Sequence, residues 1–299
     1  MTDSQGATSA LPESVPQLID DLRAEDYIAD RGLATALYLS LKLGKPLLLE
    51  GEVGVGKTEL ARTLARMTGR QLIRLQCYEG IDTQQALYEW DYARQMLHVR
   101  ALSARELNDS ETTASLYGAD FLLERPLLQA IRSGGNAVLL IDEIDRADDE
   151  FEAFLLELLS DFQITIPEIG TVAAAERPIV VLTSNRTREL HDALKRRCLY
   201  HWIGFPSIAE ELDIVRLRVP DVADTLVEQV VNAVHQLRDM DLAKPPGIAE
   251  TLDWVDALGV VGSDNLNIET AADTLGSVIK DRDDLELVHA ELDRVVADG

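Results

Sequence analysis

One stretch near residue 50 constrains the fold of this chain more than any other. An apolar run at residues 47–49 leads into Gly51-Glu52-Val53-Gly54-Val55-Gly56-Lys57-Thr58, and a segment with helical spacing begins at Glu59. This order of strand, glycine-rich turn and helix carries every position of the pattern GxxxxGK[ST], in which consecutive backbone N–H groups turn toward one anion. The stretch therefore predicts a phosphate-binding loop in an α/β fold. A glycine-rich turn that precedes a helix by coincidence is the weaker alternative.

The expected ligand of this loop is a nucleotide with Mg²⁺. Lys57 supplies a point charge near the β- and γ-phosphates, and the Thr58 hydroxyl is placed to ligate the metal ion. Backbone N–H groups around the glycines contact further phosphate oxygens. The predicted nucleotide-binding residues are Gly51, Glu52, Val53, Gly54, Val55, Gly56, Lys57, Thr58 and Glu59.

Two acids form a second candidate site. Residues 137–141 read Ala-Val-Leu-Leu-Ile, an unbroken apolar run typical of a central parallel strand that is covered on both faces, and Asp142 and Glu143 follow it. Open α/β sheets bind ligands at the carboxyl ends of their strands. Asp142 is therefore expected to reach Mg²⁺ through water, and Glu143 to orient the attacking water. A solvated acidic turn is the weaker alternative beside a phosphate loop.

A third buried strand is predicted at residues 179–183, and it ends in Ser184 and Asn185. The amide of Asn185, beside Glu143, could hold the hydrolytic water or sense the γ-phosphate. Asparagine at a strand end is also a common turn former, so the residue pattern leaves both interpretations open.

Three adjacent cations, Lys195, Arg196 and Arg197, stand out in an acidic chain. They could form surface ion pairs, which contribute little energy. Alternatively, one of them could reach the nucleotide of a neighbouring subunit, where such an arginine accelerates hydrolysis by about 10³ to 10⁵-fold. The residues alone do not separate these alternatives.

The chain is expected to contain a nucleotide-binding core and a helical domain. Residues 1–16, rich in Ser, Thr, Gln, Gly and Pro, predict a disordered tail, and residues 17–206 the α/β core. Within the core, residues 71–76 alternate like a strand, and residues 78–119 look like an insertion with an amphipathic segment at 86–97 and a polar loop at 108–115. A helix is expected at residues 122–132, and a β-hairpin at residues 163–173. From the capping-box pattern after Ser207, residues 207–299 show only helical spacing and predict an all-helical lid, whose last helix is expected at residues 285–296.

Composition restricts the partners. The 53 acidic and 28 basic residues give a formal charge of −25, which would repel a nucleic-acid backbone. The two cysteines suit a reducing compartment. An N-terminus without a basic and apolar leader, together with the lack of any run of about 18 apolar residues, predicts a cytoplasmic protein that is not inserted in a membrane.

The order of these parts resembles AAA+ ATPases, and more narrowly their MoxR-type branch. The matching segments are GEVGVGKT from Gly51, LLIDEIDRA from Leu139, FQITIPEIGTV from Phe162, LTSNR from Leu182 and ALKRRC from Ala193. The hairpin placed just before the strand that ends in asparagine is the most specific of them. The resemblance implies ATP as the nucleotide, and a P-loop core whose parallel sheet is sandwiched by helices and followed by the lid.

Within that branch the chain resembles CoxD-like proteins, which accompany molybdenum hydroxylases of the carbon monoxide dehydrogenase type. The matching segments are YEWDYARQML from Tyr88, FEAFLLELLSDFQITIPE from Phe151, TSNRTRELHDALKRRCLYHW from Thr183 and KPPGIAETLDW from Lys244. The resemblance implies a ring of subunits, taken as a hexamer, that matures a metalloenzyme client together with a partner carrying a von Willebrand factor A domain.

The resemblance also assigns roles to single residues. It implies that Asn185 is a sensor of the nucleotide and that Arg197 is the arginine supplied to the adjoining subunit, with Arg196 as the second candidate. One position departs from the family pattern. Many relatives have an arginine early in a lid helix that contacts the γ-phosphate, whereas this chain has Lys244-Pro245-Pro246-Gly247, so this contact is missing or falls to Lys244.

Three functions are compatible with this pattern. The preferred one is a remodelling ATPase that acts on a protein client. The second is a nucleotide-gated scaffold in which hydrolysis only releases the partner. The third is a DNA-processing motor, which predicts a basic hairpin; the hairpin here carries Glu168 and no Lys or Arg between Gln163 and Ala175.

Overall fold

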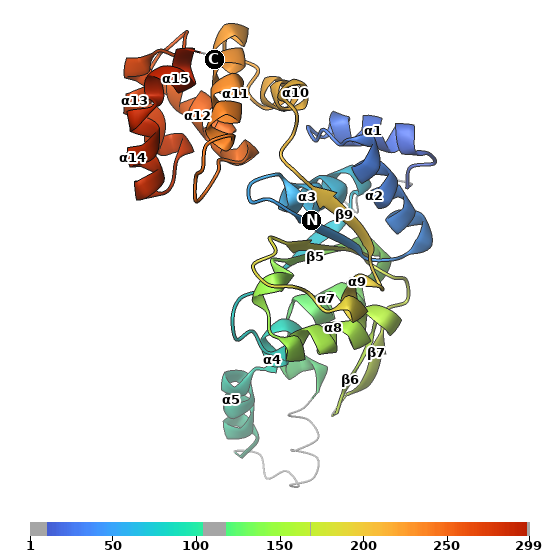
Figure 1. Cartoon of the computed structure of the whole chain (residues 1–299). Helices are drawn as coiled ribbons and strands as arrows, with labels where there is room; N and C mark the ends of the chain where they lie inside the picture. Colours follow the sequence, from blue (N-terminus) through green and yellow to red (C-terminus); the bar gives the residue numbers. More distant parts are fainter. Residues whose placement is uncertain (1–10, 104–117, 168, 298–299) are drawn as a thin grey trace, which may run out of the picture. The chain divides into compact units, whose positions relative to one another are not determined.

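A computed structural model describes residues 11–103, 118–167 and 169–297 of the chain (Figure 1). Contacts divide the chain into two compact units. The sheet unit contains Thr35–Glu50 and Leu64–His201, and the helical unit contains Ser14–Ala34, Gly51–Thr63 and Trp202–Gly299. The phosphate loop thus groups with the C-terminal helices, and the expected division into core and lid at residue 206 stays a prediction.

A five-stranded sheet has the order β2-β5-β8-β1-β9. Its strands are β1 (Leu47–Gly51), β2 (Gln71–Gln76), β5 (Ala137–Asp142), β8 (Ile179–Ser184) and β9 (Leu199–Ile203). The pairs β2–β5, β5–β8 and β1–β8 are parallel. Every residue of β1, β5 and β8 is buried, as expected of unbroken apolar runs covered on both faces. The predicted α/β class with a parallel sheet is therefore confirmed.

The register of the parallel pairs brings the C-terminal ends of neighbouring strands side by side. Gln76 pairs with Asp142, and Glu50 pairs with Ser184. One face of the sheet is covered by two helices, α7 (Pro126–Ser133) and α8 (Asp149–Asp161) (Figure 1). Apolar residues of these helices and of the strands form one core cluster, which includes Leu48, Ile73, Leu127, Ile131, Leu139, Phe151, Leu155 and Leu182.

Two of the elements predicted within and just after the insertion are wrong in detail. Residues 86–97 do not form one amphipathic segment, because β3 (Tyr88–Trp90) separates α4 (Thr83–Leu87) from α5 (Tyr92–Ser103). The helix expected over residues 122–132 is also shortened, since β4 (Leu122–Glu124) pairs with β3 and α7 begins only at Pro126. A residue before proline disfavours the helical conformation, which explains the later start. The polar segment predicted as a loop at residues 108–115 lies outside the described residues.

The remaining elements of the sheet unit are short, apart from the two helices that it shares with the helical unit. The hairpin β6 (Gln163–Ile166) and β7 (Gly170–Ala173) is confirmed, although its Glu168 lies outside the described residues. Single turns occur at Ala119–Phe121, Gly134–Asn136 and Ile144–Arg146, and α9 spans Asp192–Lys195. Both α2 (Arg31–Leu43) and α3 (Lys57–Thr68) contribute residues to each unit.

The helical unit buries a core of its own around Trp254, which is fully buried. Its C-terminal helices are α10 (Ile208–Arg218), α11 (Asp224–Arg238), α12 (Ile248–Val260), α13 (Ile268–Val278), α14 (Arg282–Ala290) and α15 (Leu292–Ala297). The capping box predicted at Ser207 begins α10. The last predicted helix, over residues 285–296, is instead two helices.

At the other end of the chain, α1 (Val15–Ala24) begins two residues inside the tail expected over residues 1–16. Ser14 caps it through a hydrogen bond to the Gln17 N–H, and Pro16 suits its first turn. Residues 1–10 lie outside the described residues. In the described part of the chain, no helix is both long and apolar enough to cross a membrane.

Candidate functional site

The phosphate loop connects β1 to α3. Gly54 and Gly56 have φ angles of 77° and 88°, in the left-handed region that favours glycine, so both glycines are needed for this backbone path. Lys57 is only 6% exposed, and its Nζ donates hydrogen bonds to the carbonyl oxygens of Gly51 and Glu52 at 2.9 and 2.5 Å. The ammonium group therefore lies over the loop, where an anion held by the loop would meet it.

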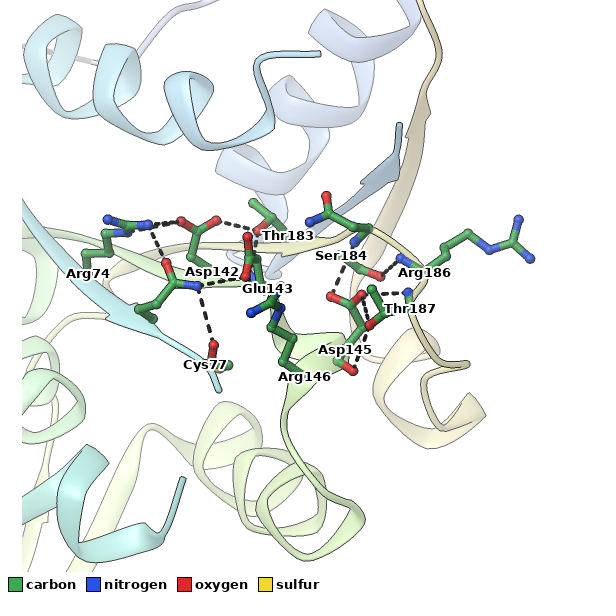
Figure 2. Close-up of polar contacts among 12 residues, drawn as sticks. Arg74, Cys77, Asp142, Glu143, Asp145, Arg146, Thr183, Ser184, Arg186 and Thr187 are labelled. Carbon is green, nitrogen blue, oxygen red and sulfur yellow. Dashed lines mark hydrogen bonds and ion pairs between the residues drawn. The ribbon is translucent and has the colours of Figure 1, made fainter. Parts of the chain in front are cut away.

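The first acid at the end of β5 is buried and accepts hydrogen bonds on both carboxylate oxygens. Asp142 is 2% exposed; Thr183 Oγ1 donates to its Oδ1 at 2.6 Å, and Arg74 Nε and Nη2 donate to its Oδ2 at 3.0 and 2.6 Å (Figure 2). Oδ2 thus already accepts two hydrogen bonds, whereas Oδ1 can accept one more. Asp142 is therefore suited to contact a Mg²⁺-bound water through Oδ1, and direct ligation through Oδ2 would require Arg74 to move.

The second acid is more accessible. Glu143 has a left-handed backbone (φ 54°) that turns it out of the strand, and its side chain is 32% exposed. Its N–H donates to Thr183 Oγ1 at 2.9 Å, so one hydroxyl contacts both acids. Its Oε2 accepts from Gln76 Nε2 at 3.1 Å and pairs with Arg146 Nε at 3.0 Å (Figure 2). A carboxylate that is held in place and open to water can orient and deprotonate a water molecule.

Asp145 organises the end of β8. It is 2% exposed, its Oδ1 accepts from the Asn185 N–H at 3.2 Å, and its Oδ2 accepts from the N–H and hydroxyl of Thr187 at 2.8 and 2.7 Å. The backbone of Asn185 is therefore held by a buried carboxylate. The side-chain amide of Asn185 forms no hydrogen bond with any residue that the structure describes, so it is available to a ligand.

The three side chains of the basic triplet, residues 195–197, differ in their contacts. Arg197 is exposed, and its Nη1 donates to the carbonyl oxygen of Leu156 in α8 at 2.7 Å. The Nζ of Lys195 lies 3.8 Å from the Oε1 of Glu189. Arg196 is exposed, and its guanidinium has no partner within the described parts of the chain. The structure therefore leaves Arg196, rather than Arg197, free for an external anion.

Several residues of this site carried no assignment from the sequence, and we call the whole set the acid cluster: Arg74, Gln76, Asp142, Glu143, Asp145, Arg146 and Thr183. Arg74 and Gln76 lie two positions apart, on one face of β2, which pairs directly with β5. The alternating pattern of β2 was visible in the sequence. Its partner strand was not, because β5 is more than 60 residues away along the chain.

Cys77 lies beside this cluster but is chemically inert. Its backbone N–H donates to the Asp142 carbonyl oxygen at 2.9 Å, and its side chain is 1% exposed. Burial raises the pKa of the thiol to about 12, and the negative charges of Asp142, Asp145 and Glu143 add to the shift. The thiol thus stays protonated at neutral pH and fills space in the core.

Each of the two units contains an oxygen donor of a kind that suits Mg²⁺. Mg²⁺ is usually bound through one or two protein oxygens together with phosphates and water. The Thr58 hydroxyl and the Asp142 carboxylate are donors of this kind. Across the described residues, no group of three or more His, Cys, Asp or Glu side chains could hold a metal ion without such help.

Comparison with known proteins agrees with this geometry. Residues 46–198, just over half of the chain, match the family "AAA domain (dynein-related subfamily)". The gas vesicle ATPase GvpN1 of Halobacterium salinarum is 24% identical over 275 residues, which cover 86% of this chain and 75% of that protein. The chaperone protein ClpB 1 of Chlorobaculum tepidum is 29% identical over 140 residues, 45% of this chain and 26% of that one.

A solved structure from Cytophaga hutchinsonii, described as a candidate ATPase, superposes with a TM-score of 0.50 at 14% identity and covers 95% of this chain and 94% of that one. At this identity the match shows the fold alone. The family match, the ATPase relative and the phosphate loop together identify the activity. This chain belongs to the AAA domain family, in its dynein-related subfamily, and is an ATPase.

Proposed function

We propose that this protein is a ring-forming, MoxR-type AAA+ ATPase that uses ATP hydrolysis to remodel a protein client. The observation that carries the proposal is the pair of unlike acids at the end of β5: Asp142 is buried and bonded on both oxygens, whereas Glu143 is open to water. The strand β1, which leads into the phosphate loop, is in register with β8 at this edge of the sheet. In this proposal, one nucleotide contacts both the loop and the acid cluster.

In this proposal each residue has one task. The loop from Gly51 to Glu59, with Lys57, binds the phosphates, and Thr58 and, through water, Asp142 hold Mg²⁺, which neutralises phosphate charge when it is bound. Glu143 orients the attacking water and accepts its proton as the bond between the γ-phosphorus and the bridging oxygen breaks. Asn185 contacts that water or the γ-phosphate, since its amide is unoccupied while its backbone is fixed by Asp145.

An arginine from a second subunit is proposed to complete the site. The family resemblance favours Arg197, whereas the contacts favour Arg196, whose guanidinium has no partner within the described residues while that of Arg197 is bonded to Leu156. Such a residue acts only in an assembled ring, which we propose to be a hexamer. Arg196→Ala and Arg197→Ala, each measured for ATP turnover in the assembled state, decide between the two residues.

The client is proposed to be a protein. The chain has a net charge of −25, and the hairpin β6–β7 carries no Lys or Arg in its described residues, so it presents no positive charge to a phosphate backbone. More specifically, we propose a cytoplasmic, CoxD-like role in which the ring matures a molybdenum hydroxylase together with a von Willebrand factor A domain partner. This part of the proposal rests on the sequence resemblance. Among the relatives compared above, one is a gas vesicle ATPase and one a chaperone.

Capture of the client tests the proposal. Glu143→Gln should bind ATP without hydrolysing it and should retain the client from the protein's own cells, whereas Lys57→Ala should retain nothing. Recovery of a molybdenum hydroxylase with a von Willebrand factor A domain protein supports the specific role. Recovery of a different metalloenzyme or of a gas vesicle component contradicts that role but keeps the remodelling function, and recovery of nucleic acid contradicts both.

The same variant separates a remodelling enzyme from a scaffold. If Glu143→Gln activates the client fully while rings stay assembled, hydrolysis serves release alone and the scaffold is correct. If the client is bound but not activated, hydrolysis drives the remodelling. Purified client assayed before and after incubation with each variant gives this result directly.

A further inference from the structure

Within the helical unit, the start of α12 contacts the phosphate loop through backbone atoms. The N–H of Ile248 donates to the carbonyl oxygen of Gly54 at 3.1 Å, and the N–H of Ala249 approaches the same oxygen at 3.4 Å. Both partners belong to the same compact unit. The first N–H groups of a helix have no partner inside the helix, so Gly54 satisfies donors that would otherwise need water or a side-chain cap.

The approach is close enough to require glycine. A Cβ atom at Gly247 would lie 2.7 Å from Gly54 Cα and 2.7 Å from the Val53 carbonyl oxygen. These are backbone atoms, which cannot rotate away as a flexible side chain would. On the other side, a Cβ at Gly54 would lie 2.9 Å from Glu250 Oε2 and 3.1 Å from Gly247 Cα. Two glycines therefore face each other, and any larger residue would push the turn and the loop apart.

This contact sets the direction of a phosphate-binding donor. In a trans peptide, the carbonyl oxygen of one residue and the N–H of the next point to opposite sides. Because the Gly54 oxygen points to the start of α12, the N–H of Val55 points away from α12. Val55 N–H is one of the consecutive donors that such a loop directs at a phosphate.

The turn before α12 is anchored to the core of the helical unit. Arg238 Nε donates to the Pro246 carbonyl oxygen at 2.7 Å, and Arg238 pairs with Glu211, whose side chain is fully buried. Thr251 Oγ1 donates to Glu211 at 2.6 Å. The N–H of Gly247 donates to Glu250 Oε2 at 2.9 Å. A shift of Gly54 would thus be resisted by a buried network of hydrogen bonds and charges.

We propose that Gly247 and the first turn of α12 are positioning elements for nucleotide binding. They hold the Gly54–Val55 peptide in the orientation that binds phosphate and couple the helical unit to the nucleotide through backbone contact. Lys244, the side chain that the sequence offered for this task, instead pairs with Asp281 at 3.0 Å and lies 65% exposed. The inference rests on the proposed nucleotide-binding role of the loop.

Substitution of Gly247 tests the inference. Gly247→Ala in the full chain should raise the Kd for a fluorescent ATP analogue by about 3- to 10-fold, the effect of one misaligned hydrogen bond. KM should rise with it, while kcat changes less. Gly276→Ala is the matched control, because a Cβ at this helical glycine of the same unit meets no atom within 4 Å. It should bind nucleotide like the unmodified protein.

Two further measurements make the result decisive. Suppose that Lys57→Ala abolishes nucleotide binding, whereas Gly247→Ala shows a normal thermal unfolding transition and binds nucleotide normally. The inference is then wrong, and the assignment of the nucleotide site is kept. If Lys57→Ala also binds normally, the assignment of the loop itself is wrong. If Gly247→Ala does not fold, hydrogen exchange in the unmodified protein decides: nucleotide should slow exchange of the Ile248 and Ala249 amides, and unchanged exchange refutes the inference.

Discussion

The phosphate loop and the acid cluster are built from different parts of the chain. The loop is one run of eight residues, from Gly51 to Thr58, and its expected contacts come mostly from backbone N–H groups. The acid cluster is formed by side chains at the ends of β2, β5 and β8, and its Arg74 and Thr183 are more than 100 residues apart in the chain. Glycines and one lysine determine the first region, and a network of hydrogen bonds determines the second.

This difference implies a division of tasks. A loop of backbone donors contacts the phosphates of substrate and product alike and so contributes mainly to binding. In the proposed mechanism Glu143, held by Gln76 and Arg146, acts on the attacking water and so contributes mainly to the rate. Substitutions in the two regions should therefore change different kinetic constants.

The largest expected effect tests this division directly. Glu143→Gln should lower kcat by about 10² to 10⁴-fold, the usual contribution of a general base, and leave the Kd for ATP within a few-fold. Lys57→Ala should raise that Kd sharply. Steady-state turnover and nucleotide titration of both variants check the prediction. If both variants lose ATP affinity equally, the loop and the acid cluster do not contribute separately to binding and to rate.

A smaller effect, on stability as well as rate, is expected at Asp145. Asp145→Ala leaves the N–H groups of Asn185 and Thr187 without their buried acceptor, and each such group costs about 1–3 kcal/mol. The free energy of unfolding should fall by about 3 kcal/mol in denaturant titrations, and kcat should fall as Asn185 moves. Asp149→Ala is the control, since that side chain is 76% exposed and should cost about 1 kcal/mol or less. Equal losses in the two variants would argue against the role of Asp145.

The same contrast explains how much the sequence predicts. The strand, turn and helix around residues 47–68, the buried strand β5 and the capping box at Ser207 follow from patterns within a few residues, and the structure confirms each of these local elements. The strand Tyr88–Trp90 was missed because its strand character depends on pairing with Leu122–Glu124. The helical spacing around it was a local signal, and tertiary pairing overrode it.

The acid cluster was predicted only in part for a similar reason. The two acids are adjacent in the chain, so Asp142 and Glu143 could be proposed from their strand. Their partners depend on strand order: Arg74 and Gln76 can reach them only because β2 lies next to β5. Nothing within β2 itself indicates this neighbour.

The amide that holds Glu143 provides a more moderate test. Gln76→Leu keeps most of the side-chain volume but removes the hydrogen bond to Glu143 Oε2. It also removes the Oε1 atom that accepts from Arg74, whose side chain is 43% exposed and can bond to water instead. Loss of one such bond corresponds to about 0.5–1.5 kcal/mol, so kcat should fall about 2- to 12-fold with KM unchanged. Gln71→Leu, at the exposed start of the same strand, is the control. A rise in KM instead would place Gln76 in the binding region.

The smallest expected effect uses the two cysteines as probes of pH. Burial raises the pKa of both Cys77 and Cys198 to about 12 from an ordinary value of 9.0, and only at Cys77 do nearby carboxylates contribute. Between these pKa values the folded protein keeps a proton on each thiol that the unfolded chain releases. The free energy of unfolding is therefore unaffected by the thiols below pH 9, and it falls as the pH rises from 9 toward 12. Between pH 8 and pH 10, each thiol should account for about 1.4 kcal/mol of lost unfolding free energy.

Comparison of the pH-dependent loss in the unmodified protein with that in Cys77→Ala and in Cys198→Ala isolates each contribution, because the cost of the substitution itself cancels between the two pH values. Each variant should lose less stability on going to pH 10 than the unmodified protein does. If removal of Cys77 leaves the pH dependence unchanged, its thiol ionises freely in the folded state. The interior beside the acid cluster would then be open to solvent, and the contrast between a buried Asp142 and an accessible Glu143 could not hold.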